Sequence, residues 1–217
     1  MAVTDQTILS EIQRLTLEGV GDSGATWPSG QWTQAEVLGY MNQRQNRFLA
    51  ETGLMWKKAE TAITAAQSNQ AAPSDWIATV FIARKTAAGL YKELPQADAF
   101  ELDLILPTWP GQTAAEPSYW YEVDGETLTT YLVPIPTAAG QALERYYVAL
   151  GTAFTAAGVN FAVPDEFVPT VKYGTLAEMF GKLGEGQTLP LATLCEARWQ
   201  EGLEMGKLIA GEGWFAL

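Results

Sequence analysis

The sequence predicts an α+β protein in which N- and C-terminal helices form a bundle and an antiparallel β module is inserted between them. Apolar residues recur at a helical spacing at both ends of the chain, whereas in the middle they alternate with polar residues. Turn-forming Pro and Gly separate the short segments of the middle region. The predicted division is a helical bundle over residues 1–55 and 165–210, a β module over 59–150, and a C-terminal tail over 211–217.

Two helices are predicted at the start of the chain. Residues 4–18 carry apolar side chains at helical spacing, and Gly19 and Gly21 are expected to stop this helix. Thr33 and Glu36 have the spacing of a capping box, which predicts a second amphipathic helix that ends near Gly53. The chain therefore opens as a helical hairpin.

The middle region reads as a series of strands. ETAITAAQ, DWIATVFIARKT and GLYKEL are short and rich in β-branched and aromatic residues. Asp124-Gly125 separates two alternating runs and is suited to a two-residue hairpin turn, while Pro134 and Pro136 close the second run. GQALERYYVAL is predicted to be the third strand of this meander.

The stretch VPDEFVPTVKYGTLAEMF, residues 163–180, marks the return to helix. Its prolines restrict the backbone and fix the angle at which the chain re-enters the helical part. Asp165 as N-cap and a start at Pro169 are both compatible with the pattern. The apolar side chains predicted to face the core are Val168, Val171, Leu176, Met179, Phe180 and Leu183.

The last predicted helix, TLPLATLCEARWQEGLEMGKLIAG, places five residues on one stripe: Cys195, Trp199, Gly202, Gly206 and Ile209. Each glycine lowers helix propensity by roughly 1 kcal/mol, so a compensating interaction is expected. We expect this stripe to pack closely against another helix or another subunit. Charged residues along the segment exclude a membrane span.

The residue inventory excludes most catalytic chemistry. The chain has no histidine and a single cysteine, so histidine-dependent triads, His-containing zinc sites and thiolate clusters are excluded. No phosphate-cradling glycine motif is present. Asp98, Glu101 and Asp103, together with eight tryptophans, raise the idea of a glycoside hydrolase. In FELDLILP, however, acids alternate with apolar residues as on the solvent face of a strand. We therefore expect no enzymatic activity, no cofactor and no metal.

The net charge of −12 is uneven: residues 1–100 hold ten acids and eight bases (−2), and residues 101–217 hold fifteen acids and five bases (−10). Without a cluster of Lys and Arg, tight nucleic-acid binding is not expected. An acidic surface can still face DNA if its task is to repel it. The single cysteine fits a reducing compartment, and no segment reads as a signal peptide or a membrane span, which predicts synthesis in a cytoplasm.

The C-terminal segment GEGWFAL ends the chain with two aromatic residues after two glycines. Gly211 is placed to end the last helix, so Trp214, Phe215 and Leu217 are free to reach a neighbouring subunit or a partner. The alternative is that this tail folds back onto its own core.

Two segments together resemble the head-to-tail adaptor, or head-completion, proteins of tailed bacteriophages. They are FELDLILPTWPGQTAAEPSYWYEVDGETLTTYLVPIPTAAGQALERYY and VPDEFVPTVKYGTLAEMF, preceded by the helix type WTQAEVLGYMNQRQNRFLAETGL. The resemblance covers residues 5–55 and 94–208. The low basic content and the aromatic tail depart from the pattern and leave the docking partner open.

The resemblance implies a structural role in the virion. It implies a homo-oligomeric ring, expected to be a dodecamer, at the head-tail junction between the phage portal protein and a tail or nozzle protein. DNA would pass through the channel during ejection, with Glu196, Glu201 and Glu204 as candidate channel acids, and the C-terminal tail would hold the portal. The rival from another class is a carbohydrate-binding module or fibre-type adhesin that uses exposed tryptophans.

Overall fold

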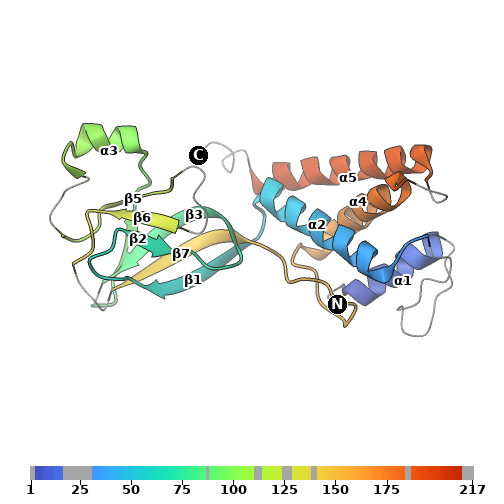
Figure 1. Ribbon diagram of the computed structural model, residues 1–217, viewed down its shortest axis with the longest axis horizontal. Coiled ribbons are helices and arrows are strands. Elements are labelled where there is room, and N and C mark those ends of the chain that lie inside the picture. The colour runs from blue at the N-terminus through green and yellow to red at the C-terminus, as the bar shows by residue number, and fades with distance from the viewer. Residues whose placement is uncertain are drawn as a thin grey trace. The chain divides into compact units, whose positions relative to one another are not determined.

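A computed structural model describes residues 3–16, 31–86, 88–109, 114–123, 129–137, 141–183 and 187–211. Within these residues the chain forms five α-helices and two antiparallel sheets, which confirms the predicted α+β class (Figure 1). The chain divides into two compact units. The helical unit contains residues 1–55 and 150–217, and the β unit contains residues 56–149.

The two N-terminal helices are α1 (Asp5–Leu15) and α2 (Gln34–Thr52). The predicted capping box of α2 is present, because the Glu36 amide donates to the Thr33 hydroxyl and the Thr33 amide donates to the Glu36 carboxylate. Helix α2 ends at Gly53, whose φ of 58° is the left-handed conformation that glycine adopts without strain. Helix α1 ends at Leu15 with Thr16 as its C-cap, so its predicted extent to residue 18 is wrong, and the glycines predicted to stop it lie outside the described residues.

The return to helix takes a form that neither predicted start describes. Asp165–Phe167 is a single 3-10 turn (η2), and α4 (Val168–Gly181) begins directly after it with Phe167 as its N-cap. Pro169 therefore sits within the first turn of α4, where a proline costs no helical hydrogen bond. Leu183 lies beyond the end of α4 and is exposed, so its predicted place in the core is wrong.

Helix α4 is the centre of the helical unit, since it contacts α1, α2 and the last helix, α5 (Leu189–Ala210) (Figure 1). The buried apolar side chains of these four helices form its core. They include Ile8, Leu9, Ile12, Val37, Met41, Phe48, Leu49, Val168, Val171, Leu176, Met179, Trp199 and Leu203.

The β unit contains a four-stranded sheet of order β1-β7-β3-β4. Its strands are β1 (Trp56–Ala62), β7 (Ala142–Ala149), β3 (Trp76–Lys85) and β4 (Tyr91–Leu94). The sequence was expected to place β7 as the third strand of the hairpin meander, and this is wrong. Strand β7 instead lies between β1 and β3 and pairs antiparallel with both of them.

A second sheet of order β2-β6-β5 holds the predicted hairpin. Its strands are β2 (Asn69–Ala71), β6 (Thr129–Val133) and β5 (Tyr119–Tyr121). Strands β5 and β6 pair antiparallel, as predicted, while the Asp124-Gly125 turn lies outside the described residues. Side chains from both sheets meet in one apolar cluster of Ile63, Ile82, Leu94, Trp120, Leu132 and Leu143.

The segment FELDLILP forms a helix, α3 (Ala99–Ile105), and its prediction as a strand is wrong. The cause is local: Asp98 is the N-cap, and Asp98 and Glu101 form a capping box with hydrogen bonds in both directions. Asp103 accepts a hydrogen bond from the Trp109 indole at 2.7 Å. These three acids therefore have structural partners at the surface.

The start of α1 is tied to a distant loop by a buried carboxylate. Asp5 is fully buried and accepts hydrogen bonds from the backbone amides of Thr155, Ala156, Gly158 and Val159 at 2.8–3.1 Å. Ala156 and Gly158 have positive φ, which turns their amides toward the carboxylate. This contact joins the first helix to the chain that follows the β unit.

Replacement of Asp5 by Asn is expected to lower the free energy of unfolding by roughly 2–4 kcal/mol. The amide NH2 group would face backbone N–H donors, and hydrogen bonds to a charged acceptor contribute about 1.5–3 kcal/mol each before compensation. Urea unfolding measures the loss. The control is Asp165→Asn, which removes charge from an exposed aspartate with one 3.4 Å hydrogen bond to the Val3 amide. Equal stability of the two variants would contradict the anchoring role.

Candidate functional site

The long helix α5 is the candidate site because its surfaces differ sharply around the axis. One face lies very close to its neighbours: a Cβ added to Gly202 would lie 2.1 Å from the Thr170 hydroxyl oxygen of α4. One added to Gly206 would lie 2.8 Å from Thr52 and 2.9 Å from Phe48 of α2. At these two glycines the backbone of α5 approaches both helices more closely than any side chain would permit.

The predicted stripe places Cys195 and Trp199 on this same face, where both are buried. Trp199 packs edge-on against Phe48, and the Arg44 guanidinium lies 5.0 Å from its ring centre. Burial raises the pKa of the Cys195 thiol, which keeps it in the unreactive protonated form at neutral pH. Ile209, by contrast, is 65% exposed, so its place on the buried stripe is wrong. It lies beyond Gly206, which already packs against the last turn of α2.

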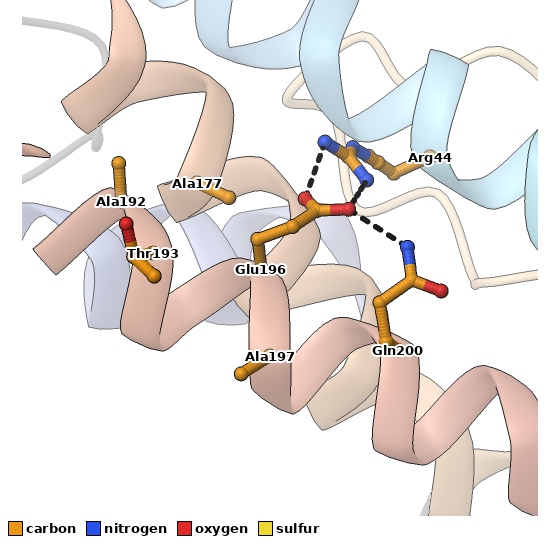
Figure 2. Close-up of a pocket in the computed structure, with 7 residues that line it drawn as sticks. All are labelled: Arg44, Ala177, Ala192, Thr193, Glu196, Ala197 and Gln200. Atoms are coloured by element: carbon orange, nitrogen blue, oxygen red, sulfur yellow. Dashed lines mark hydrogen bonds and ion pairs between the residues drawn. The ribbon is translucent and has the colours of Figure 1, made fainter.

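A groove lies beside this face, between α2, α4 and α5 (Figure 2). Its volume is about 510 Å³, and three alanines form much of its wall. The residues that line it are Arg44, Ala177, Ala192, Thr193, Glu196, Ala197 and Gln200.

Arg44 from α2 crosses to two carboxylates at the groove. Its guanidinium lies 2.7 Å from Glu178 of α4. It also lies 2.8 Å from Glu196 of α5, to which Gln200 donates a further hydrogen bond (Figure 2). Burial would raise the pKa of Glu196, but the hydrogen bonds from Gln200 and Arg44 outweigh it and hold this pKa below its ordinary value. The cluster holds one positive and two negative charges and ties three helices together.

Each of the three candidate channel acids has an ion-pair partner within the chain. Glu196 pairs with Arg44, while the more exposed Glu201 and Glu204 pair with Arg198 and Lys207. Exposed pairs of this kind are weak, with energies of about 0–1 kcal/mol. The side chains of Glu201 and Glu204 are 61% and 64% exposed, so they keep most of their contact with solvent.

Ion pairs also neutralise most of the cations. Ten of the thirteen basic residues, all of which lie in the described ranges, form an ion pair with a carboxylate. They are Arg44, Arg47, Lys57, Lys58, Arg84, Lys85, Lys172, Lys182, Arg198 and Lys207. A surface that binds phosphates needs clustered, uncompensated cations, and this arrangement does not supply them.

The described part of the chain offers neither a metal site nor a membrane span. It contains no group of three or more acidic or cysteine side chains that could hold an ion. None of its helices is long and apolar enough to cross a bilayer.

The tryptophans do not form a flat exposed platform among the described residues. Trp32, Trp120 and Trp199 are buried, Trp76 and Trp109 are half-buried, and Trp56 is exposed. A small pocket of about 280 Å³ in the β unit is lined by Trp109 and Tyr121, by Ser68, and by residues 132–135 at the end of β6. Trp27 and the tail residues Trp214, Phe215 and Leu217 lie outside the described residues.

Sequence reasoning missed an apolar strip on the other side of α5. Leu191, Leu194, Met205 and Leu208 are all exposed, between 42% and 75%. Their spacing of three, eleven and three residues was a readable signal for one helical face. The sequence analysis instead assigned packing only to the stripe that contains Gly202 and Gly206, which is the buried face.

The close approach of α5 predicts that added volume at Gly202 is costly. Gly202→Ala should lower the free energy of unfolding by about 1–3 kcal/mol through overpacking against Thr170, although alanine favours helix. The control is Gly39→Ala in α2, where nothing lies within 4 Å of the added Cβ. That variant should gain up to about 1 kcal/mol. Thermal melts of both variants measure the difference, and a Gly202→Ala protein that melts higher than the parent would contradict the packing.

The Arg44 cluster predicts a pH-dependent stability difference. Arg44→Met should lower the free energy of unfolding by about 2 kcal/mol at pH 7, less than for a fully buried pair because both carboxylates are about one-third exposed. Because the pKa of Glu196 is lowered in the folded parent, the parent's advantage is present above the unfolded pKa and disappears as the pH falls through the folded pKa. Denaturant unfolding at neutral and acidic pH measures this, with Arg47→Met as the exposed control. A gap that stays constant as the pH falls would contradict the assignment.

Comparison with known proteins identifies the family of this chain. The sequence model of the SU10 adaptor protein family matches residues 6–212, which is nearly the whole chain and includes both units. A search of curated proteins gives no match. The match confirms the resemblance to phage head-to-tail adaptors, and the chain belongs to the SU10 adaptor protein family.

Proposed function

We propose that this protein is the structural subunit of a ring that joins the portal of a phage head to the tail. The observation that carries the proposal is the family match over residues 6–212, which spans the helical unit and the β unit alike. The site chemistry supports a structural role, since its charged cluster ties helices together and the sequence holds no histidine. The ring would stand at the head-tail junction of the virion and is proposed to be a dodecamer.

The charge distribution supports passage of DNA through the ring without tight binding. The chain carries a net charge of −12, and ion pairs occupy ten of its thirteen cations. A channel lined mainly by carboxylates repels the phosphate backbone and lets the genome slide. Glu201 and Glu204 are the better channel candidates, because Glu196 is held by the buried Arg44.

The partners proposed for the two ends of the ring are the portal protein and a tail or nozzle protein. We propose that residues 211–217 add an anchor on a neighbouring subunit or the portal. Burial of a Trp or Phe side chain stabilises a contact by about 1.5–3 kcal/mol, which is repeated in every subunit of a ring.

The purified protein is expected to form rings on its cognate portal, and negative-stain images together with the mass of the complex measure this. A chain that ends at Ala210 should keep its melting temperature but lose co-purification with the portal. A parent chain that neither forms rings nor binds the portal would overturn the adaptor function. A truncated chain that melts lower and still docks would overturn only the role of the tail.

A further inference from the structure

The four-stranded sheet of the β unit has two edge strands. In the order β1-β7-β3-β4, strand β1 pairs on one side only, and so does β4 at the opposite edge (Figure 1). Strand β1 is seven residues long, and its side chains are exposed or half-buried along its whole length. A regular edge strand of this kind offers a row of backbone N–H and C=O groups to which another strand can add.

The usual protection of an edge strand is weak at β1. Native edge strands are blunted by prolines, by bulges or by lysine side chains. Strand β1 contains no proline, and its pairing with β7 has no shift in register. Its two lysines are held by carboxylates of the same chain. Lys57 lies 2.7 Å from Asp75, and Lys58 lies 2.6 Å from Glu144. The edge of β1 is therefore a surface that favours coverage by a further strand.

The hydrogen bonds of β1 identify the residues that face its outer edge. The Ile63 amide donates to the Gln141 carbonyl, and these two residues continue the β1–β7 register as a hydrogen-bonded pair. Hydrogen-bonded and non-hydrogen-bonded pairs alternate along an antiparallel ladder. The backbone groups of Lys58, Glu60 and Ala62 therefore point away from β7, toward the outer edge.

The same alternation identifies the outward-facing residues of β4. The Thr86 amide donates to the Leu90 carbonyl, and this hydrogen-bonded pair continues the β3–β4 register. The next pair along the ladder, Lys85 with Tyr91, is then non-hydrogen-bonded, and so is the pair formed by Glu93. The backbone groups of Tyr91 and Glu93 therefore point away from β3, and both side chains are exposed.

The two edges are compatible in strand direction and in pleat. All neighbouring strands of the sheet are antiparallel, so β1 and β4, with two strands between them, run in opposite directions. Rotation about a ring axis keeps each strand's direction along that axis, so β4 of one copy meets β1 of the next copy antiparallel. The three ladders also place Glu60 and Glu93 in one row, on the same face of the sheet. A sheet continued from one copy to the next therefore keeps its faces.

Side-chain charge distinguishes the registers of such a contact. Three registers place Tyr91 and Glu93 opposite outward-facing residues of β1. In one of them Glu93 lies opposite Glu60, and in another Lys92 lies opposite Lys57. Like charges directly opposite each other destabilise a pair of strands.

The remaining register opposes no like charges. It places Glu93 opposite Lys58 and Tyr91 opposite Glu60. Glu93 takes part in no ion pair of the described residues. The Lys58 ammonium has three N–H donors, so its ion pair with Glu144 leaves donors for a second carboxylate.

We propose that β4 of one copy pairs antiparallel with β1 of the next copy, so that the β units of the assembly share one continuous sheet. Lys58 with Glu93 and Glu60 with Tyr91 form its hydrogen-bonded pairs. The backbone supplies the contact, and the side-chain charges fix its register. Two different edges meet, so each added copy presents one further edge of each kind until a ring closes. The inference rests on the ring assembly proposed above and names a surface that builds it.

A two-fold pairing of β1 with β1 of a second copy is the alternative contact. With Ala59 on the two-fold axis, it would place Lys58 opposite Glu60 twice, so charge does not exclude it. This contact stops at a dimer and leaves β4 uncovered in both copies, whereas a contact of β4 with β1 uses both edges. The two contacts differ in the residue that lies opposite Ala59, which is Lys92 in the proposed contact.

Cysteines at these two positions test the contact in the full-length chain. Ala59 and Lys92 are a non-hydrogen-bonded pair of the proposed ladder, with Cα atoms about 4.5 Å apart and within reach of a disulfide. Within one chain they lie on opposite edges, three strand spacings or roughly 14 Å apart, which no disulfide spans. A chain with both Ala59→Cys and Lys92→Cys should therefore form disulfides only between copies. The parent chain, whose single Cys195 is buried, is the control.

Non-reducing gels of oxidised protein, assembled with its cognate portal, give the result. The double variant should yield a series of covalent multimers that ends at the size of the ring. Each single variant should give no covalent product alone, and an equimolar mixture of the two should give a covalent pair of chains and nothing larger. A covalent dimer from Ala59→Cys alone would overturn the proposal in favour of the two-fold contact. Rings of the double variant without disulfides would overturn any pairing of these edges.

A proline at Glu60 tests the backbone part of the contact independently. The Glu60 amide faces the outer edge, so Glu60→Pro removes no hydrogen bond between β1 and β7. The matched control, Glu60→Ala, also loses the 3.0 Å ion pair with Lys85 but keeps the amide N–H. Light scattering after size-exclusion chromatography should show rings for Glu60→Ala and monomers for Glu60→Pro under the same conditions. Rings from Glu60→Pro would overturn the proposal, and if this variant does not fold, the cysteine experiment decides.

Failure of this contact and failure of the adaptor function are distinguishable. A parent that forms rings on the portal, while the double cysteine variant forms the same rings without disulfides, would overturn the edge contact and leave the adaptor function standing. A parent that binds no portal and forms no ring would count against the proposed function itself.

Discussion

The close approach of α5 to α4 and α2 is the constraint on which the rest of the helical unit depends. At Gly202 and Gly206 there is no room for a Cβ, because side chains of Thr170, Thr52 and Phe48 lie directly against the α5 backbone along this seam. Gly174 repeats the pattern from the α4 side, where an added Cβ would lie 2.7 Å from Trp199. With three helices this near, the Arg44 side chain spans from α2 to carboxylates on both others. The groove and the apolar strip are what remains outside this seam.

Local rules were sufficient for much of the fold. The capping box of Thr33 and Glu36, the left-handed stop at Gly53 and the change from helical to alternating period are all encoded within a few residues. The same rules failed at FELDLILP, where alternation of acids and apolar residues competed with an Asp98-Glu101 capping box and the capping box prevailed. Partnering of β7 was not predictable, because its pairing with β1 and β3 joins segments far apart in sequence.

Only part of the candidate site could be predicted from the sequence, again because the rest depends on contacts between segments far apart in the chain. The glycines on α5 could be read from their four-residue spacing, whereas the groove needs Arg44 beside Glu196, 152 residues later in the chain. No local pattern announces such a pair. The charge excess was visible from composition, but the pairing of ten of the thirteen cations with carboxylates required coordinates.

Both passages of the chain between the two units lie at one end of the β1–β7 ladder. The units meet at residues 55/56 and 149/150, and Trp56 is the direct partner of Val148 across the two strands. A segment whose first and last residues are neighbours can be exchanged for another without rethreading its host. In evolutionary terms the β unit is thus a segment that can be replaced as one piece while the sequence of the helical unit stays unchanged.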